Sequence, residues 1–211
     1  MKLALFDYGA GNLHSLGKAL EAAQATVTVT SDWDKALRLD GLVLPGVGAF
    51  GPAARALPDD IGPLRRRLEE GYPCLGICLG MQLLFDASDE SDGHGIGLVP
   101  GRVRHLESAV VPHMGWNDVE TAEDPIFDGI EQLVAYYANS YICEPVDSAA
   151  AIAWSTYEGR RFAAGLRAAN TWGLQYHPEK SSLPGRQIIT NFVRLAAETR
   201  QASPDSVESR A

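Results

Sequence analysis

The stretch that decides the fold reads Cys74-Leu75-Gly76-Ile77-Cys78-Leu79-Gly80-Met81-Gln82. The first four residues of this stretch belong to the segment Pro73–Ile77, which we expect to form a short buried strand. A helix is expected to begin at Leu79, so Cys78 would lie on the turn between strand and helix. Glycines on both sides of a sharp turn allow other backbone to pass close to it. The stretch therefore predicts a strand and a helix of an α/β fold, with one cysteine at their junction.

Strands alternate with helices through the first half of the chain. Expected strands are Lys2–Phe6, Thr26–Thr30 and Gly41–Leu44. One helix is expected after Asn12, which would cap it, with Leu13, Leu16 and Leu20 on one face. A second, charged helix is expected at Ile61–Glu70. This alternation is typical of a mostly parallel sheet with helices on both faces.

The second half, from Arg102 to Gln175, changes to short strands and turns. Its clearest strand patterns are Leu133–Tyr141, Ala151–Thr156 and Phe162–Leu166. We expect these strands to extend the same sheet in antiparallel fashion. The pattern at Gln187–Thr199 predicts a closing amphipathic helix. We therefore expect one domain over residues 1–200, followed by a disordered tail at residues 201–211.

Composition excludes several classes of function. The chain has 211 residues, of which 45% are hydrophobic and 21% charged, as in ordinary globular proteins. Its net charge of −9 argues against a nucleic-acid partner, which needs a basic surface. Apolar runs are far shorter than the roughly 20 residues that span a bilayer, and Met1–Tyr8 is too short for a signal peptide. Three cysteines with no metal-like spacing to histidines favour the reducing cytoplasm over a disulfide framework.

The position of Cys78 suggests a nucleophile. The first turn of the following helix would point free N–H groups at the sulfur and stabilise its thiolate form. The alternative is that Cys78 is simply a small buried apolar residue. We expect Cys74 to be part of the core and Cys143 to be structural.

A thiolate that attacks an acyl group needs a histidine, and the histidine needs a carboxylate to hold its tautomer. Both occur in Gln175-Tyr176-His177-Pro178-Glu179. Pro178 biases His177 toward an extended backbone, so the side chains of His177 and Glu179 would project to the same side. His14, His94 and His105 lack a carboxylate at this spacing.

A glycine-rich turn follows the strand at Gly41–Leu44. It reads Pro45-Gly46-Val47-Gly48-Ala49-Phe50-Gly51. Its N–H groups, with that of Leu79, could meet the oxyanion of a tetrahedral intermediate. No glycine-rich loop of the chain ends in Lys-Ser/Thr, so a nucleotide-binding P-loop is not supported.

Two separated motifs resemble those of the class I (triad) glutamine amidotransferases. They are Gly76-x-Cys78-x-Gly80-x-Gln82 and His177-Pro178-Glu179. Four further segments resemble the glutaminase subunits of imidazole glycerol phosphate synthase within that family: Asp7-Tyr8-Gly9-x-Gly11-Asn12-Leu13, Leu44–Phe50, Pro112-His113-Met114-Gly115-Trp116-Asn117 and Glu179-Lys180-Ser181-Ser182. The resemblance covers residues 2 to 196.

This resemblance implies a flavodoxin-like α/β sheet and a glutaminase that forms a heterodimer with a separate (β/α)8-barrel cyclase. It implies that Cys78 attacks glutamine, that His177 relays protons and that Glu179 orients His177. Other implied contacts are an oxyanion hole of Gly46, Val47, Gly48 and Leu79, and a glutamine site of Gln82, Ser140 and Tyr141. Members usually carry histidine before that Ser-Tyr pair, where this chain has Asn139. No metal or organic cofactor is implied.

The segment Pro112–Asn117 is expected to be a loop at the partner interface. Trp116, Asn117 and Lys180 would then contact the partner; the alternative is that Trp116 is core and Lys180 a solvated charge. Two other functions remain open: a glutaminase of the anthranilate, aminodeoxychorismate or pyridoxal phosphate type, and a catalytically silent docking subunit. The Met-Gly-Trp-Asn and Glu-Lys-Ser-Ser segments argue against the first, and the intact Cys-His-Glu set argues against the second.

Overall fold

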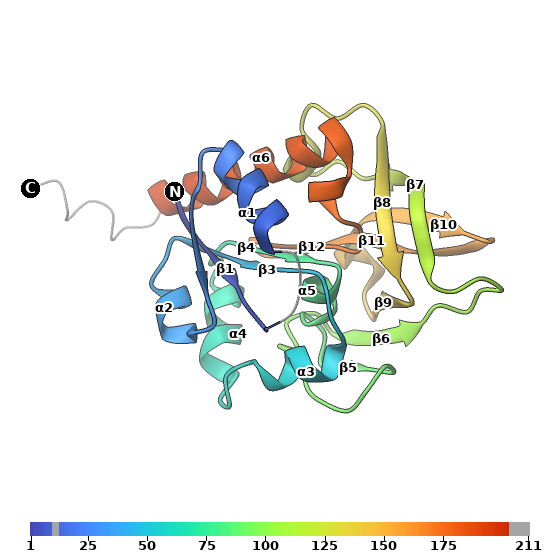
Figure 1. Ribbon diagram of the computed structural model, residues 1–211, viewed down its shortest axis with the longest axis horizontal. Coiled ribbons are helices and arrows are strands. Elements are labelled where there is room, and N and C mark those ends of the chain that lie inside the picture. The colour runs from blue at the N-terminus through green and yellow to red at the C-terminus, as the bar shows by residue number, and fades with distance from the viewer. Residues whose placement is uncertain (10–12, 203–211) are drawn as a thin grey trace, which may run out of the picture.

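A single mixed sheet runs through the centre of the molecule (Figure 1). The computed structural model describes residues 1–9 and 13–202. In spatial order, the strands of the main path are β2 (Thr26–Thr30), β1 (Lys2–Phe6), β3 (Gly41–Leu44), β4 (Cys74–Ile77), β12 (Thr171–Leu174), β11 (Arg160–Ala168), β10 (Ala151–Tyr157), β7 (His113–Thr121) and β8 (Leu133–Asn139). The first five are parallel and the remaining pairs are antiparallel. The expected mostly parallel sheet with antiparallel additions is confirmed.

Helices cover both faces of the parallel half, as expected. On one face, α1 (Leu13–Ala22) lies beside α6 (Ser182–Ala202), and Leu16, Leu20 and Phe192 join one buried apolar cluster. The other face carries α2 (Trp33–Leu37), α3 (Phe50–Arg55), α4 (Gly62–Glu69) and α5 (Leu79–Gln82). Because helices bury both faces of the sheet, β3 and β4 are apolar throughout and do not alternate between apolar and polar residues.

Most strands of the first half have the expected bounds, but the second half differs in two places. The segment Pro112–Asn117, expected to be a loop, is largely strand, because β7 begins at His113 and pairs with β8 over seven residues. The run Leu133–Tyr141, expected as one strand, is broken at Ser140. After the break, β9 (Tyr141–Pro145) leaves β8 to pair with β6 (Gly101–His105), which also pairs with the short β5 (Ala87–Ser88).

The closing helix is longer than the sequence pattern indicated. It extends to Ala202 and so includes the first two residues of the expected tail. The rest of that tail, and Asn12 as the expected cap of α1, lie outside the described residues.

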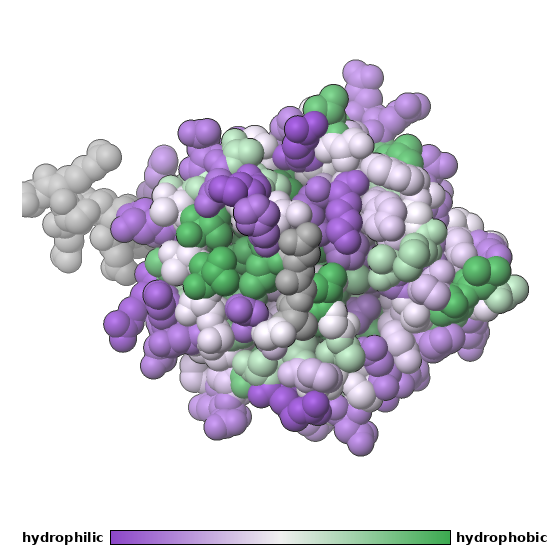
Figure 2. Space-filling view, viewed as in Figure 1, coloured by the Kyte–Doolittle hydropathy of each residue, from purple (hydrophilic) through white to green (hydrophobic). Residues whose placement is uncertain are grey.

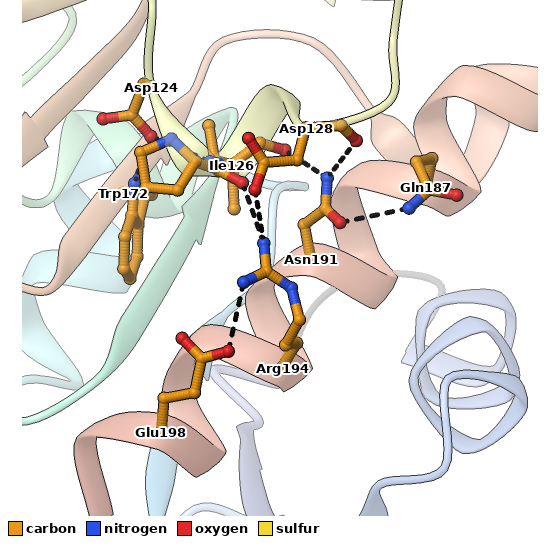
Figure 3. Close-up of polar contacts among 9 residues, drawn as sticks. Asp124, Ile126, Asp128, Trp172, Gln187, Asn191, Arg194 and Glu198 are labelled. Atoms are coloured by element: carbon orange, nitrogen blue, oxygen red, sulfur yellow. Dashed lines mark hydrogen bonds and ion pairs between the residues drawn. The ribbon is translucent and has the colours of Figure 1, made fainter. Parts of the chain in front are cut away.

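Polar contacts fasten α6 to the 3-10 turn η1 (Pro125–Phe127) (Figure 3). The amide of Asn191 donates to the carbonyls of Ile126 and Asp128 at 3.0 and 2.9 Å. Asp124, just before the turn, accepts from the indole N–H of Trp172 at 3.1 Å. Because Trp172 belongs to β12, these contacts fix the strand that leads to His177.

Figure 2 shows a face that is mostly hydrophilic, with apolar side chains gathered in separate patches. Among residues 1–9 and 13–202, no helix is long and apolar enough to cross a membrane.

Candidate active site

Cys78 lies on a strained turn between β4 and α5. Its φ of 50° and ψ of −102° are rare for a residue with a side chain. Two glycines make the turn possible: a Cβ on Gly76 would come 2.6 Å from the carbonyl oxygen of Gly80, and one on Gly80 would come 2.9 Å from Cβ of Leu44. The turn therefore has the strained strand-to-helix geometry that the sequence predicted for Cys78.

His177 reaches Cys78 because the two residues follow neighbouring parallel strands. Leu174 of β12 pairs with Ile77 of β4, so both chains emerge at the same edge of the sheet. The N–H of Cys78 donates to the carbonyl of Leu174 at 2.6 Å, which locks the two strand ends together. The ring of His177 is 2% exposed and lies close enough to the thiol of Cys78 for that group to raise its pKa.

Glu179 holds the other side of the ring. Its Oε1 lies 2.9 Å from Nδ1 of His177, and its side chain is 8% exposed. His177 has the extended backbone expected before proline, but Glu179 lies in a 3-10 turn, η3 (Pro178–Lys180). The two side chains thus meet across a tight turn rather than along an extended strand.

The surroundings of His177 have opposing effects on its pKa. Burial disfavours the charged ring, but hydrogen bonds and charge interactions with Cys78 and Glu179 outweigh burial and raise the pKa to about 9. A ring that keeps its proton at neutral pH can deliver it to a leaving group.

The expected oxyanion donors lie on two segments that adjoin Cys78. A Cβ on Gly46 would come 2.9 Å from Cβ of Cys78, so the glycine-rich turn packs directly on the elbow. Among the described residues, no acceptor is found for the N–H groups of Gly46, Val47 or Gly48. Leu79 begins α5, and the first amides of a helix have no acceptor within it. These donors are free to bind an oxyanion.

The expected glutamine-binding residues also come together. The carbonyl of Tyr141 accepts from the amide of Gln82 at 3.4 Å and from the amide of Asn139 at 3.0 Å. Ser140 lies between β8 and β9, at the break in the strand. Asn139, which stands where family members usually have histidine, therefore helps to hold the backbone at Tyr141 in place.

Two contacts at the site were missed from the sequence. The fully buried Gln175 donates its amide N–H to Sγ of Cys78 at 3.6 Å. Glu90 accepts from the N–H of Phe50 at 2.7 Å and so anchors the end of the glycine-rich turn. Gln175 lies two residues before His177, so its nearness to the His-Pro-Glu motif could have indicated a place at the site. Nothing local connects Glu90 with a residue 40 positions away.

The other two cysteines are not at the site. Cys74 and Cys143 are buried and free, and burial raises the pKa of each thiol above its ordinary value. Neither residue has a histidine or carboxylate bonded to its sulfur among the described residues, which agrees with the expected core and structural roles.

Of the residues expected at a partner interface, two lie beside Tyr136 and the third bonds within the chain. Trp116 points outward with 54% of its surface exposed, and its ring centroid lies 5.9 Å from that of Tyr136. Nζ of Lys180 lies 5.7 Å from the same tyrosine ring. The amide of Asn117 instead bonds within the chain, to the carbonyl of Thr156 at 3.0 Å. Trp116 is thus not a core residue.

Comparison with known proteins agrees with this geometry. Residues 4–196 match the family described as glutamine amidotransferase class-I. Imidazole glycerol phosphate synthase subunit HisH of Natronomonas pharaonis is 44% identical over 210 residues, covering 93% of this chain and 96% of the relative. The protein of that name from Synechococcus elongatus is 40% identical over 204 residues, covering 93% and 94%. PurLQS from Thermotoga maritima shares the fold, with a TM-score of 0.73 at 19% identity over 94% of this chain and 98% of that one.

Proposed function

The chain belongs to the class-I glutamine amidotransferase family and is a glutaminase subunit of imidazole glycerol phosphate synthase, and we propose that Cys78, His177 and Glu179 form its catalytic triad. One observation carries this assignment. A cysteine on a strained elbow interacts with a buried histidine and raises its pKa, and Oε1 of Glu179 lies 2.9 Å from Nδ1 of that histidine. These are the parts of a thiol-dependent acyl-transfer site.

The reaction proceeds in two halves. The thiolate of Cys78 attacks the carboxamide carbon of glutamine, and the carbonyl oxygen becomes an oxyanion. His177 gives its proton to the nitrogen, the C–N bond breaks, and ammonia leaves a thioester on Cys78. His177 then takes a proton from water, whose oxygen attacks the thioester; the C–S bond breaks, and glutamate and the thiolate are released.

The N–H groups of the turn at Gly46, Val47 and Gly48, with that of Leu79, stabilise the oxyanion in this proposal. Their proximity to Cys78 and their lack of an acceptor among the described residues support it. One preorganised donor of this kind is typically worth about 3–4 kcal/mol of the activation barrier. Gln82 and the backbone of Ser140 and Tyr141 bind the α-amino and carboxylate groups of glutamine, supported by the bond between Gln82 and the Tyr141 carbonyl.

The relatives are named as subunits, so this chain works with a partner subunit. We propose that the partner is a (β/α)8-barrel cyclase, which uses the ammonia to make imidazole glycerol phosphate and aminoimidazole carboxamide ribonucleotide in histidine biosynthesis. Exposed Trp116 and Lys180 contact it, while Asn117 supports β7 from the inner face. A reduced Cys78 is required, and the three free cysteines support a cytoplasmic location.

An electrophilic glutamine analogue, such as a chloroketone, tests the triad directly. We expect one adduct per chain, located on Cys78 by peptide mass spectrometry and prevented by excess glutamine. Cys74 and Cys143 in the same digest are internal controls and should stay unmodified. Labelling of either of these two in place of Cys78 would overturn the assignment.

A further inference from the structure

Two buried polar atoms without a partner belong to residues that pair across β7 and β8. His113 and Asn139 are directly opposite in the strand register and are 2% and 5% exposed. Within the described part of the chain, neither Nδ1 of His113 nor Oδ1 of Asn139 has a hydrogen-bond partner. A buried polar atom left without a partner costs about 1–3 kcal/mol, so two such atoms on paired residues require an explanation.

The neighbours of His113 define which of its nitrogens carries the proton. Asn117 donates its amide N–H to the carbonyl of Thr156 at 3.0 Å and accepts from the N–H of Asp118 at 2.9 Å, which fixes the orientation of the amide. The same amide nitrogen lies 3.4 Å from Nε2 of His113. Since an amide nitrogen only donates, Nε2 is the acceptor. Burial lowers the pKa of His113 to about 4, so at neutral pH the ring is uncharged with its hydrogen on Nδ1.

The neighbours of Asn139 define its orientation in the same way. Its amide nitrogen donates to the carbonyl of Tyr141 at 3.0 Å, which leaves Oδ1 as a free acceptor. His113 therefore carries a free donor, and Asn139, opposite it in the register, carries a free acceptor. Opposite residues of an antiparallel pair have Cβ atoms about 4.5–5.5 Å apart, so the two side chains lie within reach of each other.

We propose that His113 and Asn139 join through an Nδ1–H to Oδ1 hydrogen bond and act as positioning residues for glutamine. The bond completes a buried chain of contacts from Thr156 through Asn117, His113 and Asn139 to the carbonyl of Tyr141. Gln82 donates to that same carbonyl at 3.4 Å. The proposal rests on the proposed function, because it takes Gln82 and Tyr141 as glutamine contacts.

The ring of His113 is well held for this task. Its centroid lies 4.5 Å from that of Tyr137 and 4.0 Å from that of Tyr157, in stacked geometry on both. The ring therefore presents Nδ1 in one direction, and through Asn139 it fixes the Tyr141 peptide and the Gln82 side chain. No member of this chain of contacts bonds to His177 or Glu179 in the described residues. Loss of the bond should weaken glutamine binding and leave the chemical step nearly unchanged.

Steady-state kinetics of the full chain in complex with its partner subunit test the proposal. Asn139→Asp keeps an acceptor toward His113 but places a second oxygen against the Tyr141 carbonyl. Asn139→Leu removes both hydrogen bonds, and His113→Phe keeps the stacked ring. We expect each Asn139 variant to raise KM for glutamine about 10-fold with kcat within about twofold, and His113→Phe to raise KM severalfold.

A double variant and a matched control separate positioning from general loss of stability. His113→Phe combined with Asn139→Leu should have the KM of Asn139→Leu alone, because both changes break one chain of contacts. Tyr137→Phe keeps the ring beside His113 but removes the 2.6 Å bond to Ser155 in the same core. It should lower the melting temperature without changing KM. Additive effects on KM, or an unchanged KM in the Asn139 variants, would reject the proposal.

Nuclear magnetic resonance of the histidine nitrogens gives a readout that does not depend on activity. We expect the Nδ1–H tautomer for His113 and a changed Nδ1–H shift in Asn139→Asp. A proton on Nε2 in the parent would overturn the bond even if all kinetic effects appeared. Absence of glutamine hydrolysis in the parent complex would instead reject the proposed function, and the nitrogen shifts would still decide whether the bond exists.

Discussion

Oε1 of Glu179 lies 2.9 Å from Nδ1 of His177, and both side chains are almost completely shielded from solvent. Together with Cys78, this carboxylate raises the pKa of His177 to about 9 against the effect of burial. A raised pKa in the folded state means that the contacts stabilise the fold fully below the ordinary histidine pKa of about 6.5. That stabilisation is lost as the pH rises through about 9.

Replacing Cys78 by alanine should abolish glutamine-dependent synthesis by the complex and leave ammonia-dependent synthesis intact. In the proposed function the thiolate is needed only to release ammonia, so the proposed cyclase partner should accept free ammonia. The measurement compares product formation with glutamine and with ammonium chloride as nitrogen sources. Cys143→Ala is the matched control and should retain both activities. Near-normal glutamine hydrolysis by Cys78→Ala would refute the assigned nucleophile.

Replacing Glu179 by glutamine should leave the fold intact and slow glutamine hydrolysis by roughly 10²–10⁴-fold, because the wrong tautomer of His177 is favoured. Loss of the carboxylate also removes one cause of the raised His177 pKa, which should fall toward its ordinary value. Turnover measured against pH, with circular dichroism to check folding, tests both effects. A variant as active as the parent would show that Glu179 does not orient the ring.

The isolated chain should hydrolyse glutamine poorly. Binding of the partner subunit should raise its rate of hydrolysis. Among the described residues, the N–H groups of Gly46, Val47 and Gly48 have no acceptor that would hold their peptides in place. Gly48 has a φ of 124°, and glycine can change its backbone angles at little steric cost. Completion of one oxyanion donor would raise kcat on the order of 10²–10³-fold. Glutamate production is measured for the free chain and for the chain saturated with cyclase and cyclase ligand. Equal rates would reject this prediction.

Trp116→Ala should weaken the complex, since Trp116 is 54% exposed and lies against Tyr136, whose ring Lys180 also contacts. Buried interface tryptophans typically contribute about 2 kcal/mol or more, which corresponds to a Kd raised at least about 30-fold. Val29→Ala is the control, because Val29 is 50% exposed on β2, at the other end of the sheet. Titration calorimetry should show a large effect for Trp116→Ala only; equal effects of the two changes would remove Trp116 from the interface.

His113 should make the fold sensitive to acid. Burial lowers its pKa to about 4, so between about pH 6.5 and 4 the unfolded chain binds a proton that the folded chain does not. The free energy of unfolding should therefore fall as the pH is lowered through this range, by on the order of 2 kcal/mol from this residue. Urea unfolding at several pH values gives the free energy of unfolding as a function of pH. Between about pH 6.5 and 4 this free energy should fall less steeply for His113→Phe than for the parent. Parallel curves for the two proteins would contradict the prediction.

Local patterns in the sequence determined most of the first half of the fold. Apolar runs gave strands at Lys2–Phe6, Thr26–Thr30 and Gly41–Leu44 with the bounds that the structure has. The glycines around Cys78 predicted its strained turn, because only glycine allows backbone to approach so closely there. These features depend on residues near one another in the chain, so periodicity and residue type are sufficient to predict them.

Tertiary structure alone decided which distant residues meet. The segment Pro112–Asn117 was wrongly expected to be a loop, because the pairing of β7 with β8 depends on a segment about twenty residues further along the chain. The contact of Gln175 with Cys78 and the pairing of His113 with Asn139 follow from strand order and register. The contact of Glu90 with Phe50 likewise depends on the packing of distant segments. Sequence motifs can identify a nucleophile, a base and a carboxylate. Their mutual distances are set by packing between segments far apart in the chain, which no local pattern encodes.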